Sequence, residues 1–276
     1  MSELNSGKGH KDENFPVASW ILKREHRAPI MAFYRFARAA DDIADHPTAP
    51  PEEKLMRLAQ MRAGLTGKGA PAAMALAEVT QARGLELTHA NELLDAFVQD
   101  VTVHRYADWE ALIGYCRNSA MPVGRFVLDV HGEDRAVWPL SDALCAALQI
   151  INHLQDCGKD YRAIDRVYVP TSNLEAAGID TEALSSPVAS PALRRVIKGL
   201  AQQTTLLLQR SAPFAAHVKD RRLSAEVAVI QALAEDLVQL LLTRDPLSEN
   251  VHHSKPRAAS LAIRAIVRNL VASKRS

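Results

Sequence analysis

This sequence contains two pairs of aspartates, and within each pair the two residues are one helical turn apart. Such spacing can build a binding site for a divalent cation. The first aspartate row, Asp41 and Asp45, lies in the segment FYRFARAADDIAD. Helix geometry places residues i and i+4 on one face, about 6 Å apart along the axis. Like charges at this spacing destabilise an isolated helix by roughly 0.2–0.5 kcal/mol. A face that is not simply solvated therefore requires a compensating cation.

The second aspartate row, Asp156 and Asp160, lies in LQIINHLQDCGKDY, with Asn152 one turn earlier and Gln149 on the same side. The neighbouring residues are mostly apolar, which predicts a buried helix whose carboxylates need a partner or a metal ion. Two facing rows would form a cage of oxygen ligands, which Mg²⁺ prefers when it bridges carboxylates to substrate phosphates. Arg38, one turn before the first row, would add a direct phosphate contact. One row alone is common on solvated helices, but the pair predicts a magnesium and phosphate site.

Composition and charge indicate what kind of protein carries these rows. Hydrophobic residues make up 47% of the 276 residues and aromatic residues only 5%, which favours helices over sheets. The formal net charge of +1 argues against a protein that binds nucleic acid. Three cysteines without zinc spacing indicate reduced thiols and a cytoplasmic location. No signal core or membrane span stands out, so we expect a soluble protein that can still touch the inner face of a membrane.

Periodicity and helix breakers predict a single all-α domain. We expect disorder over residues 1–12, a helical domain over 13–245 and a basic segment over 246–276. The predicted helices cover residues 17–44 with a turn before Pro29, 52–65, 71–83, 89–104, 109–130, 141–160, 192–217 and 222–243, followed by a final amphipathic helix.

Three local features refine these helices. Thr88 and Ser141 are candidate N-caps, because their hydroxyls can accept a hydrogen bond from a free N–H of the first turn. Pro122 should bend or interrupt the helix that contains it. The final helix carries apolar residues together with Arg264 and Arg268, and two interpretations stay open for it. It either packs back on the core or contacts a membrane surface or a partner.

Beyond the spacing of the aspartates, the segments that contain and surround them resemble motifs of the squalene/phytoene synthase family. FYRFARAADDIAD is similar to the family's first aspartate motif, and LQIINHLQDCGKDY with the following DRVYVP is similar to its second. YCRNSAMPVGR is similar to the segment that holds the family's active-site tyrosine, and ENFPVAS resembles the hopanoid-pathway subgroup that makes hydroxysqualene. The resemblance implies an isoprenoid-synthase-type helical bundle with a central apolar cavity.

The resemblance also implies roles for individual residues. Two roles stay open: Arg35 contacts a phosphate or pairs with Asp42 or Asp45, and Tyr115 faces a carbocation or is a core tyrosine. Asn118, Met121 and Asp165 depart from the family pattern; Asp165 replaces an expected glycine and leaves the loop geometry uncertain, and Met121 could alter the tunnel wall. The implied magnesium ligands are Asp41, Asp45, Asp156 and Asp160; the implied diphosphate contacts are Asn14 and Arg38; the implied pocket contacts are Phe15, Tyr34, Tyr115, Gln149 and Asn152.

The implied reaction is the magnesium-dependent conversion of presqualene diphosphate to hydroxysqualene. Arg38 would help the diphosphate to leave, Tyr115 would face the cation, and water would capture the rearranged cation. The implied pathway partners are a presqualene diphosphate synthase before this step and a hydroxysqualene reductase after it. An alternative within the family is condensation of two farnesyl or geranylgeranyl diphosphates to presqualene diphosphate or phytoene.

Two alternatives come from other classes of protein. A di-iron carboxylate bundle is suggested by Glu86-x-x-His89 and Glu249-x-x-His252, but neither pair is expected inside a long helix. A helical scaffold without catalytic activity is the other, and it predicts that replacing the aspartates leaves function intact.

Overall fold

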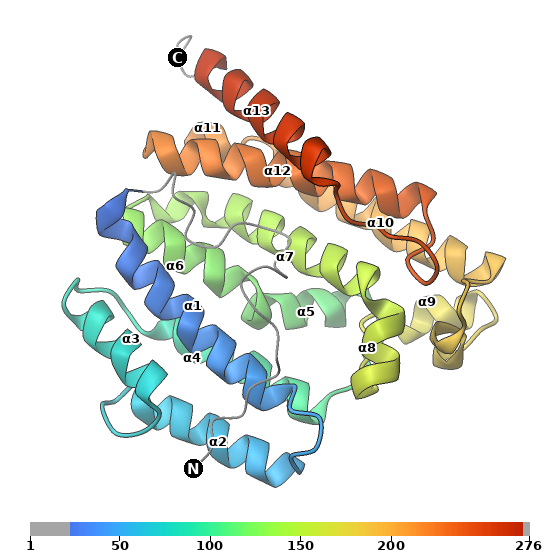
Figure 1. The fold of residues 1–276 in the computed structure, drawn as a ribbon, viewed down its shortest axis with the longest axis horizontal. Coiled ribbons are helices and arrows are strands. Elements are labelled where there is room, and N and C mark those ends of the chain that lie inside the picture. The colour runs from blue at the N-terminus through green and yellow to red at the C-terminus, as the bar shows by residue number, and fades with distance from the viewer. Residues whose placement is uncertain (1–22, 273–276) are drawn as a thin grey trace. The chain divides into compact units, whose positions relative to one another are not determined.

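The computed structural model describes residues 23–272, and these form helices without any strand (Figure 1). Within this range the extended backbone is limited to an isolated bridge between Arg105 and Val167. The all-α prediction is therefore confirmed. The predictions for residues 1–12, Asn14 and Phe15 lie outside the described residues. None of the described helices combines the length and the apolar content that crossing a membrane requires.

The chain divides into two compact units. Unit 1 takes Met1–Val103 and Asn118–Arg135, and unit 2 takes His104–Arg117 and Ala136–Ser276, so the chain passes from one unit to the other three times. Unit 1 contains α1 (Arg24–Ala44), α2 (Pro51–Gly64), α3 (Pro71–Gln81), α4 (Thr88–Thr102) and α6 (Met121–His131).

Unit 1 has a core that α1 shares with the other four helices (Figure 1). Phe33 of α1 stacks on Phe126 of α6 with ring centroids 4.2 Å apart, and Phe36 is fully buried beside them. Because α1 buries one stripe of apolar side chains, its opposite side is available for the polar residues of the first aspartate row.

Helix α1 continues through Pro29, so the predicted turn before this proline is wrong. Proline has no N–H to donate to the carbonyl four residues earlier, which here belongs to Glu25. The guanidinium of Arg83 donates to that carbonyl instead. A side chain 58 residues away thus satisfies the carbonyl oxygen that the proline leaves without its helical partner.

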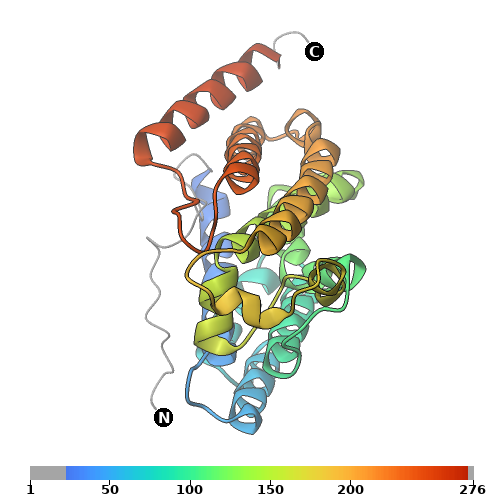
Figure 2. The same cartoon turned by 90° about the vertical axis from the view of Figure 1, so that its right-hand side faces the viewer.

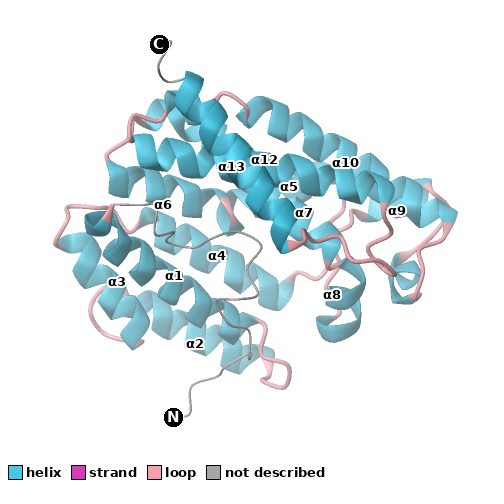
Figure 3. Ribbon diagram, turned by 45° about the horizontal axis from the view of Figure 1, so that its top comes forward, coloured by secondary structure: helices cyan, strands magenta, loops and turns pink. Residues whose placement is uncertain are grey.

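Unit 2 is built around α7, α10 and α12, which pack on one another (Figure 3). Their contact faces are lined by fully buried aliphatic side chains such as Ile150, Ile197 and Leu241. Its elements are α5 (Trp109–Ser119), η1 (Arg135–Val137), α7 (Trp138–Gln155), α8 (Cys157–Ile164), α9 (Thr171–Ala176), η2 (Thr181–Ser185), α10 (Pro191–Ser211), α11 (Phe214–His217), α12 (Arg221–Thr243) and α13 (Lys255–Ala272), with α5 and η1 each reaching into residues counted with unit 1.

Several predicted helix boundaries differ from those of the structure. Thr88 is the first residue of α4 rather than its N-cap, and its hydroxyl lies 3.5 Å from the carboxylate of Glu86. Ser141 lies inside α7, which begins three residues earlier at Trp138 with a proline at the next position. The predicted helix over 141–160 ends at Gln155, and a second helix begins at Cys157. The interruption near Pro122 is confirmed, because Ala120 separates α5 from α6.

Candidate active site

The first aspartate row lies at the C-terminal end of α1. Asp41 is in the last turn, and Asp45 is the C-cap residue whose N–H donates to the Asp41 carbonyl over 2.8 Å. This bond keeps the two residues one helical turn apart, as their spacing predicts. Both residues are half-buried. Arg38 contacts Asp41 at 2.6 Å and Asp42 at 3.0 Å, so Asp42 pairs with this arginine.

The electrostatic setting of this row is unfavourable. The C-terminal end of a helix carries a partial negative charge, which disfavours carboxylates there. The last turn of α1 contains no basic residue, yet Asp41 and Asp42 are in it and Asp45 follows directly. Arg38, one turn earlier, offsets part of this charge through its two ion pairs. A divalent cation would offset more of it.

The second aspartate row lies at the junction of α7 and α8. Asp156 separates the two helices with φ of −99° and ψ of 7°. The helical bonding nevertheless continues across it, because Asp156 N–H donates to Asn152 at 3.0 Å and Asp160 N–H donates to Asp156 at 2.8 Å. The junction changes the direction of the chain but keeps Asn152, Asp156 and Asp160 successive turns apart.

The second row has a favourable electrostatic setting. Asp156 is the N-cap residue of α8 and Asp160 lies in its first turn, where the partial charge of a helix is positive. The start of α8 also fits closely against its surroundings. A Cβ atom at Gly158 would lie 2.5 Å from Leu247 and 3.2 Å from the Leu184 carbonyl. A glycine between the two aspartates is therefore what allows α8 to begin so close to its neighbours.

Tyr115 belongs to a cluster of aromatic rings next to the second row. Its ring centroid lies 5.2 Å from Tyr106, 5.4 Å from Tyr168 and 6.0 Å from His153. The hydroxyls of Tyr115 and Tyr168 are 3.4 Å apart, and Arg166 donates to the Tyr168 hydroxyl at 3.2 Å. All three tyrosines are buried. The predicted catalytic tyrosine therefore lies among rings from α5, α7 and the chain on either side of them.

His153 joins this cluster to Gln149, one turn earlier on α7. Its ring stacks on Tyr168 with centroids 3.4 Å apart and planes inclined by 13°. The side-chain amide of Gln149 donates to Nε2 of His153 at 2.9 Å, so this nitrogen is the acceptor. Burial of the ring, reinforced by the charge of Arg166, lowers the pKa of His153 to about 3. The imidazole is therefore neutral at neutral pH.

The segment between α8 and α9 positions Arg166 and Tyr168. Asp165 ends α8 with φ of 49° and ψ of 38°, the left-handed conformation for which glycine is the usual residue. Aspartate tolerates this conformation better than most residues do. Arg105 further holds it by donating to both the carboxylate and the carbonyl of Asp165. The departure from glycine is thus accommodated, and the left-handed turn leads directly into Arg166.

The structure brings some of the predicted site residues together, but it does not test whether the two aspartate rows face each other. Tyr115, Gln149 and the second row gather in unit 2, whereas the first row lies in unit 1. That the two rows face each other stays a prediction. Within the described residues, no three side chains of His, Cys, Asp or Glu gather closely enough to hold a metal ion. The predicted ligands are all carboxylates, a donor set that suits Mg²⁺.

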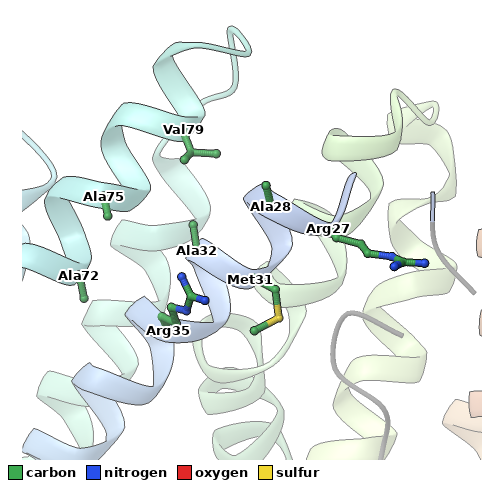
Figure 4. A pocket seen from close by; sticks show the side chains of 8 residues that line it. All are labelled: Arg27, Ala28, Met31, Ala32, Arg35, Ala72, Ala75 and Val79. Atoms are coloured by element: carbon green, nitrogen blue, oxygen red, sulfur yellow. The ribbon is translucent and has the colours of Figure 1, made fainter. Parts of the chain in front are cut away.

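The remaining predicted residues lie on α1. Tyr34 is half-buried, and Arg35 is exposed at the edge of a cavity of about 460 Å³ (Figure 4). The cavity lies between α1 and α3, and its lining is mostly apolar, with Met31 and Val79 among the residues. Arg38 rather than Arg35 makes the ion pair with Asp42.

Sequence reasoning missed His153, Arg166, Tyr168 and Tyr106 as members of the site. Arg166 and Tyr168 stand in DRVYVP, the loop that follows the second motif. A signal was present, since alternating polar and apolar residues in RVYV are typical of an extended segment. For His153, the signal is its place one helical turn after Gln149, which puts the two side chains on one face of α7.

Comparisons with known proteins place this geometry in context. Residues 8–257 match the family described as squalene/phytoene synthase. A hydroxysqualene synthase from Rhodopseudomonas palustris is 56% identical, covering 91% of this chain and 87% of that protein. Of two relatives from Zymomonas mobilis, a hydroxysqualene synthase is 53% identical over 94% of this chain and 89% of its own length. The other, a presqualene diphosphate synthase, is 31% identical over 72% of this chain and 69% of its own length.

A solved structure has a similar fold. The squalene synthase HpnC from Alicyclobacillus acidocaldarius superposes with a TM-score of 0.72 at 30% identity, covering 83% of this chain and 88% of that one. The structural likeness extends over most of the elements described above.

Proposed function

This chain is an enzyme of the squalene/phytoene synthase family, and from that membership we propose that it converts presqualene diphosphate to hydroxysqualene. One observation carries the choice of reaction. Within a single organism, Zymomonas mobilis, the hydroxysqualene synthase shares 53% identity with this chain and the presqualene diphosphate synthase only 31%. The opening ENFPVAS supports the same choice.

Departure of the diphosphate needs positive charge around its oxygens. Asp41, Asp45, Asp156 and Asp160 would hold Mg²⁺, which when bound supplies much of that charge. Arg38 lies one turn before the first row and already pairs with two carboxylates. Its planar guanidinium can exchange a carboxylate for a phosphate oxygen without moving to another part of the helix. This exchange would place a second positive group at the leaving diphosphate.

The carbocation needs electron-rich surroundings that do not react with it. Tyr106, Tyr115 and Tyr168 present aromatic rings, whose faces attract cations. The low pKa of His153 keeps its imidazole neutral, so the positive charge in this cluster comes from Arg166, whose guanidinium donates to the Tyr168 hydroxyl. Water capture forms a carbon–oxygen bond and releases one proton. The aromatic cluster would protect the cation until that bond forms.

The proposed reaction implies a place in a pathway and in the cell. The substrate would come from a presqualene diphosphate synthase, and a hydroxysqualene reductase would consume the product on the way to squalene and hopanoids. We infer a cytoplasmic enzyme with peripheral contact at the inner face of the membrane, because both substrate and product carry long hydrocarbon chains.

Product analysis tests the reaction directly. The purified protein is incubated with presqualene diphosphate and Mg²⁺, without a reductant, in water enriched in ¹⁸O. Mass spectrometry should find hydroxysqualene with the label in its hydroxyl group. Recovery of unchanged substrate contradicts the proposal. Formation of presqualene diphosphate or phytoene from farnesyl or geranylgeranyl diphosphate, in a parallel incubation, supports the condensation alternative instead.

A further inference from the structure

One face of α13 is fixed against unit 2. Ala265 is buried there, and the amide of Asn269 donates to the Ser224 hydroxyl of α12 at 3.0 Å. Arg257 binds both carboxylate oxygens of Asp236 on α12, at 2.7 and 2.6 Å. Figure 2 shows α13 lying beyond α12 at one end of the unit. These contacts determine which side of α13 points away from the unit.

The opposite face of α13 carries an exposed apolar stripe. Ile263 is 63% exposed, and the others are between 44% and 54% exposed. The positions follow the spacing i, i+4, i+7 and i+8, so they share one side of the helix. Aligned large apolar side chains on a surface mark a contact with another molecule more often than scattered ones do. The outer stripe of α13 consists of Ile263, Val267, Leu270 and Val271.

The charges beside the stripe are all positive. Arg264 and Arg268 are exposed and follow the first two residues of the outer stripe by one position each. From Lys255 to Ser276 the sequence contains six lysine and arginine residues and no acidic residue. An apolar stripe flanked by cations is the pattern of a helix that lies in the interface of an anionic membrane. We propose that the outer stripe of α13 docks on an anionic lipid surface.

Charge also argues against a second copy of the chain as the occupant. In a symmetric dimer the same stripe would meet itself, bringing two sets of Arg264 and Arg268 around one contact. No acidic residue of α13 could neutralise them. An anionic bilayer offers hydrocarbon to the stripe and negative headgroups to the arginines at once. This inference rests on the proposed function, because a lipid substrate gives the enzyme a reason to bind a membrane. Its test measures membrane binding and does not require the enzyme to form product.

Flotation of the full chain with lipid vesicles tests the proposal. One set of vesicles contains phosphatidylcholine alone, and the other contains equal parts of phosphatidylcholine and phosphatidylglycerol. We expect binding to the anionic set that weakens with added salt. Ile263→Ser should weaken binding roughly tenfold, because it removes apolar area from the interface. The double variant Arg264→Gln and Arg268→Gln should weaken it about fivefold for each arginine.

A matched control variant comes from α10. Leu206 is as exposed as Ile263, so Leu206→Ser removes a similar apolar surface elsewhere on unit 2 and should leave binding unchanged. Circular dichroism verifies that each variant keeps its helices. Equal binding of Ile263→Ser and Leu206→Ser, or no binding to either vesicle, overturns the proposal. A dimer in solution that Ile263→Ser abolishes also overturns it and assigns the stripe to a second copy. If the protein binds vesicles but forms no hydroxysqualene, the membrane proposal holds and the proposed function fails.

Discussion

The two aspartate rows have the same spacing but lie at opposite ends of their helices. In both, the N–H of the second aspartate donates to the carbonyl of the first at 2.8 Å. Asp41 and Asp45 end α1, where the helix is partially negative, whereas Asp156 and Asp160 begin α8, where it is partially positive. The comparison teaches that spacing determines the geometry of the carboxylates, while the helix end determines their electrostatic environment. The first row needs a cation more than the second does.

The neighbours of the two rows differ in a corresponding way. The first row is paired with a guanidinium, from Arg38. The second row lies in sequence between the neutral imidazole of His153 and the ring of Tyr168, which stack on each other, and Arg166 donates to the Tyr168 hydroxyl. In the proposed reaction, the first setting suits the anion that leaves, and the ring faces of the second are available to the cation that remains.

The largest expected effect concerns the carboxylates themselves. Asp41→Asn and Asp156→Asn should each reduce hydroxysqualene formation by about a thousandfold or more, because each removes a charge that holds the ion at the leaving group. Asp42→Asn is the matched control; Asp42 shares Arg38 with Asp41 but is not a predicted ligand, so its loss should stay within about tenfold. Product formation from presqualene diphosphate measures all three. Near-normal turnover in Asp41→Asn or Asp156→Asn would count against a shared metal site and favour a scaffold.

The neutral imidazole beside the second row predicts a pH dependence of stability. The pKa of His153 is about 3 in the folded protein and near 6.5 in an unfolded chain. As the pH falls from 6.5 towards 3, the unfolded chain takes up a proton that the folded protein does not, so the folded state loses up to about 1.4 kcal/mol per pH unit. His153→Phe, which keeps a ring to stack on Tyr168, should flatten this dependence. Urea unfolding of both proteins across this range provides the measurement, and parallel curves would contradict the assignment.

Close packing at the start of α8 predicts a third effect. Gly158→Ala should destabilise the protein by about 1–2 kcal/mol, because its Cβ would displace the Leu247 side chain, 2.5 Å away, and crowd the backbone carbonyl of Leu184 at 3.2 Å. Gly199→Ala on α10 is the matched control, since nothing lies within 4 Å of the position that its Cβ atom would take, and it should stabilise the helix by up to about 1 kcal/mol. Thermal unfolding distinguishes them. If both variants are equally stable, the close approach does not constrain the second row.

The smallest expected effect is the most direct test of the comparison. At low salt and with a chelator present, Asp45→Asn should stabilise the protein by about 0.3–1 kcal/mol, and Asp160→Asn should destabilise it by a similar amount. The signs differ because the two carboxylates lie at opposite helix ends. Added Mg²⁺ should remove the advantage of Asp45→Asn. Chemical denaturation with and without Mg²⁺ measures these differences, and effects of the same sign in both variants would refute the electrostatic contrast.

The sequence predicts the helices well, because each depends on local periodicity. The break near Pro122 and the final amphipathic helix follow from nearby residues alone. One wrong prediction, the turn before Pro29, and one open point, the loop at Asp165, involve partners that are distant in sequence. Continuation of α1 through Pro29 depends on Arg83, and the left-handed turn at Asp165 is held by Arg105. No local pattern contains that information.

The same distinction applies to the candidate site. The spacing of each aspartate row is predictable because one helical turn is a local property. The electrostatic contrast was not predicted, because it depends on α7 ending at Gln155 rather than running to Asp160. The aromatic cluster was only partly predicted, because its rings come from separate segments that meet only in the folded chain.

The bond between Arg83 and the Glu25 carbonyl makes the effect of one mutation depend on another residue. Arg83 is on the surface, and its replacement would be judged harmless from exposure alone. In a background that carries Pro29, however, the replacement leaves the exposed Glu25 carbonyl to water; in a background with alanine there, the helix supplies its own donor. The effect of replacing Arg83 should therefore depend on the residue at position 29.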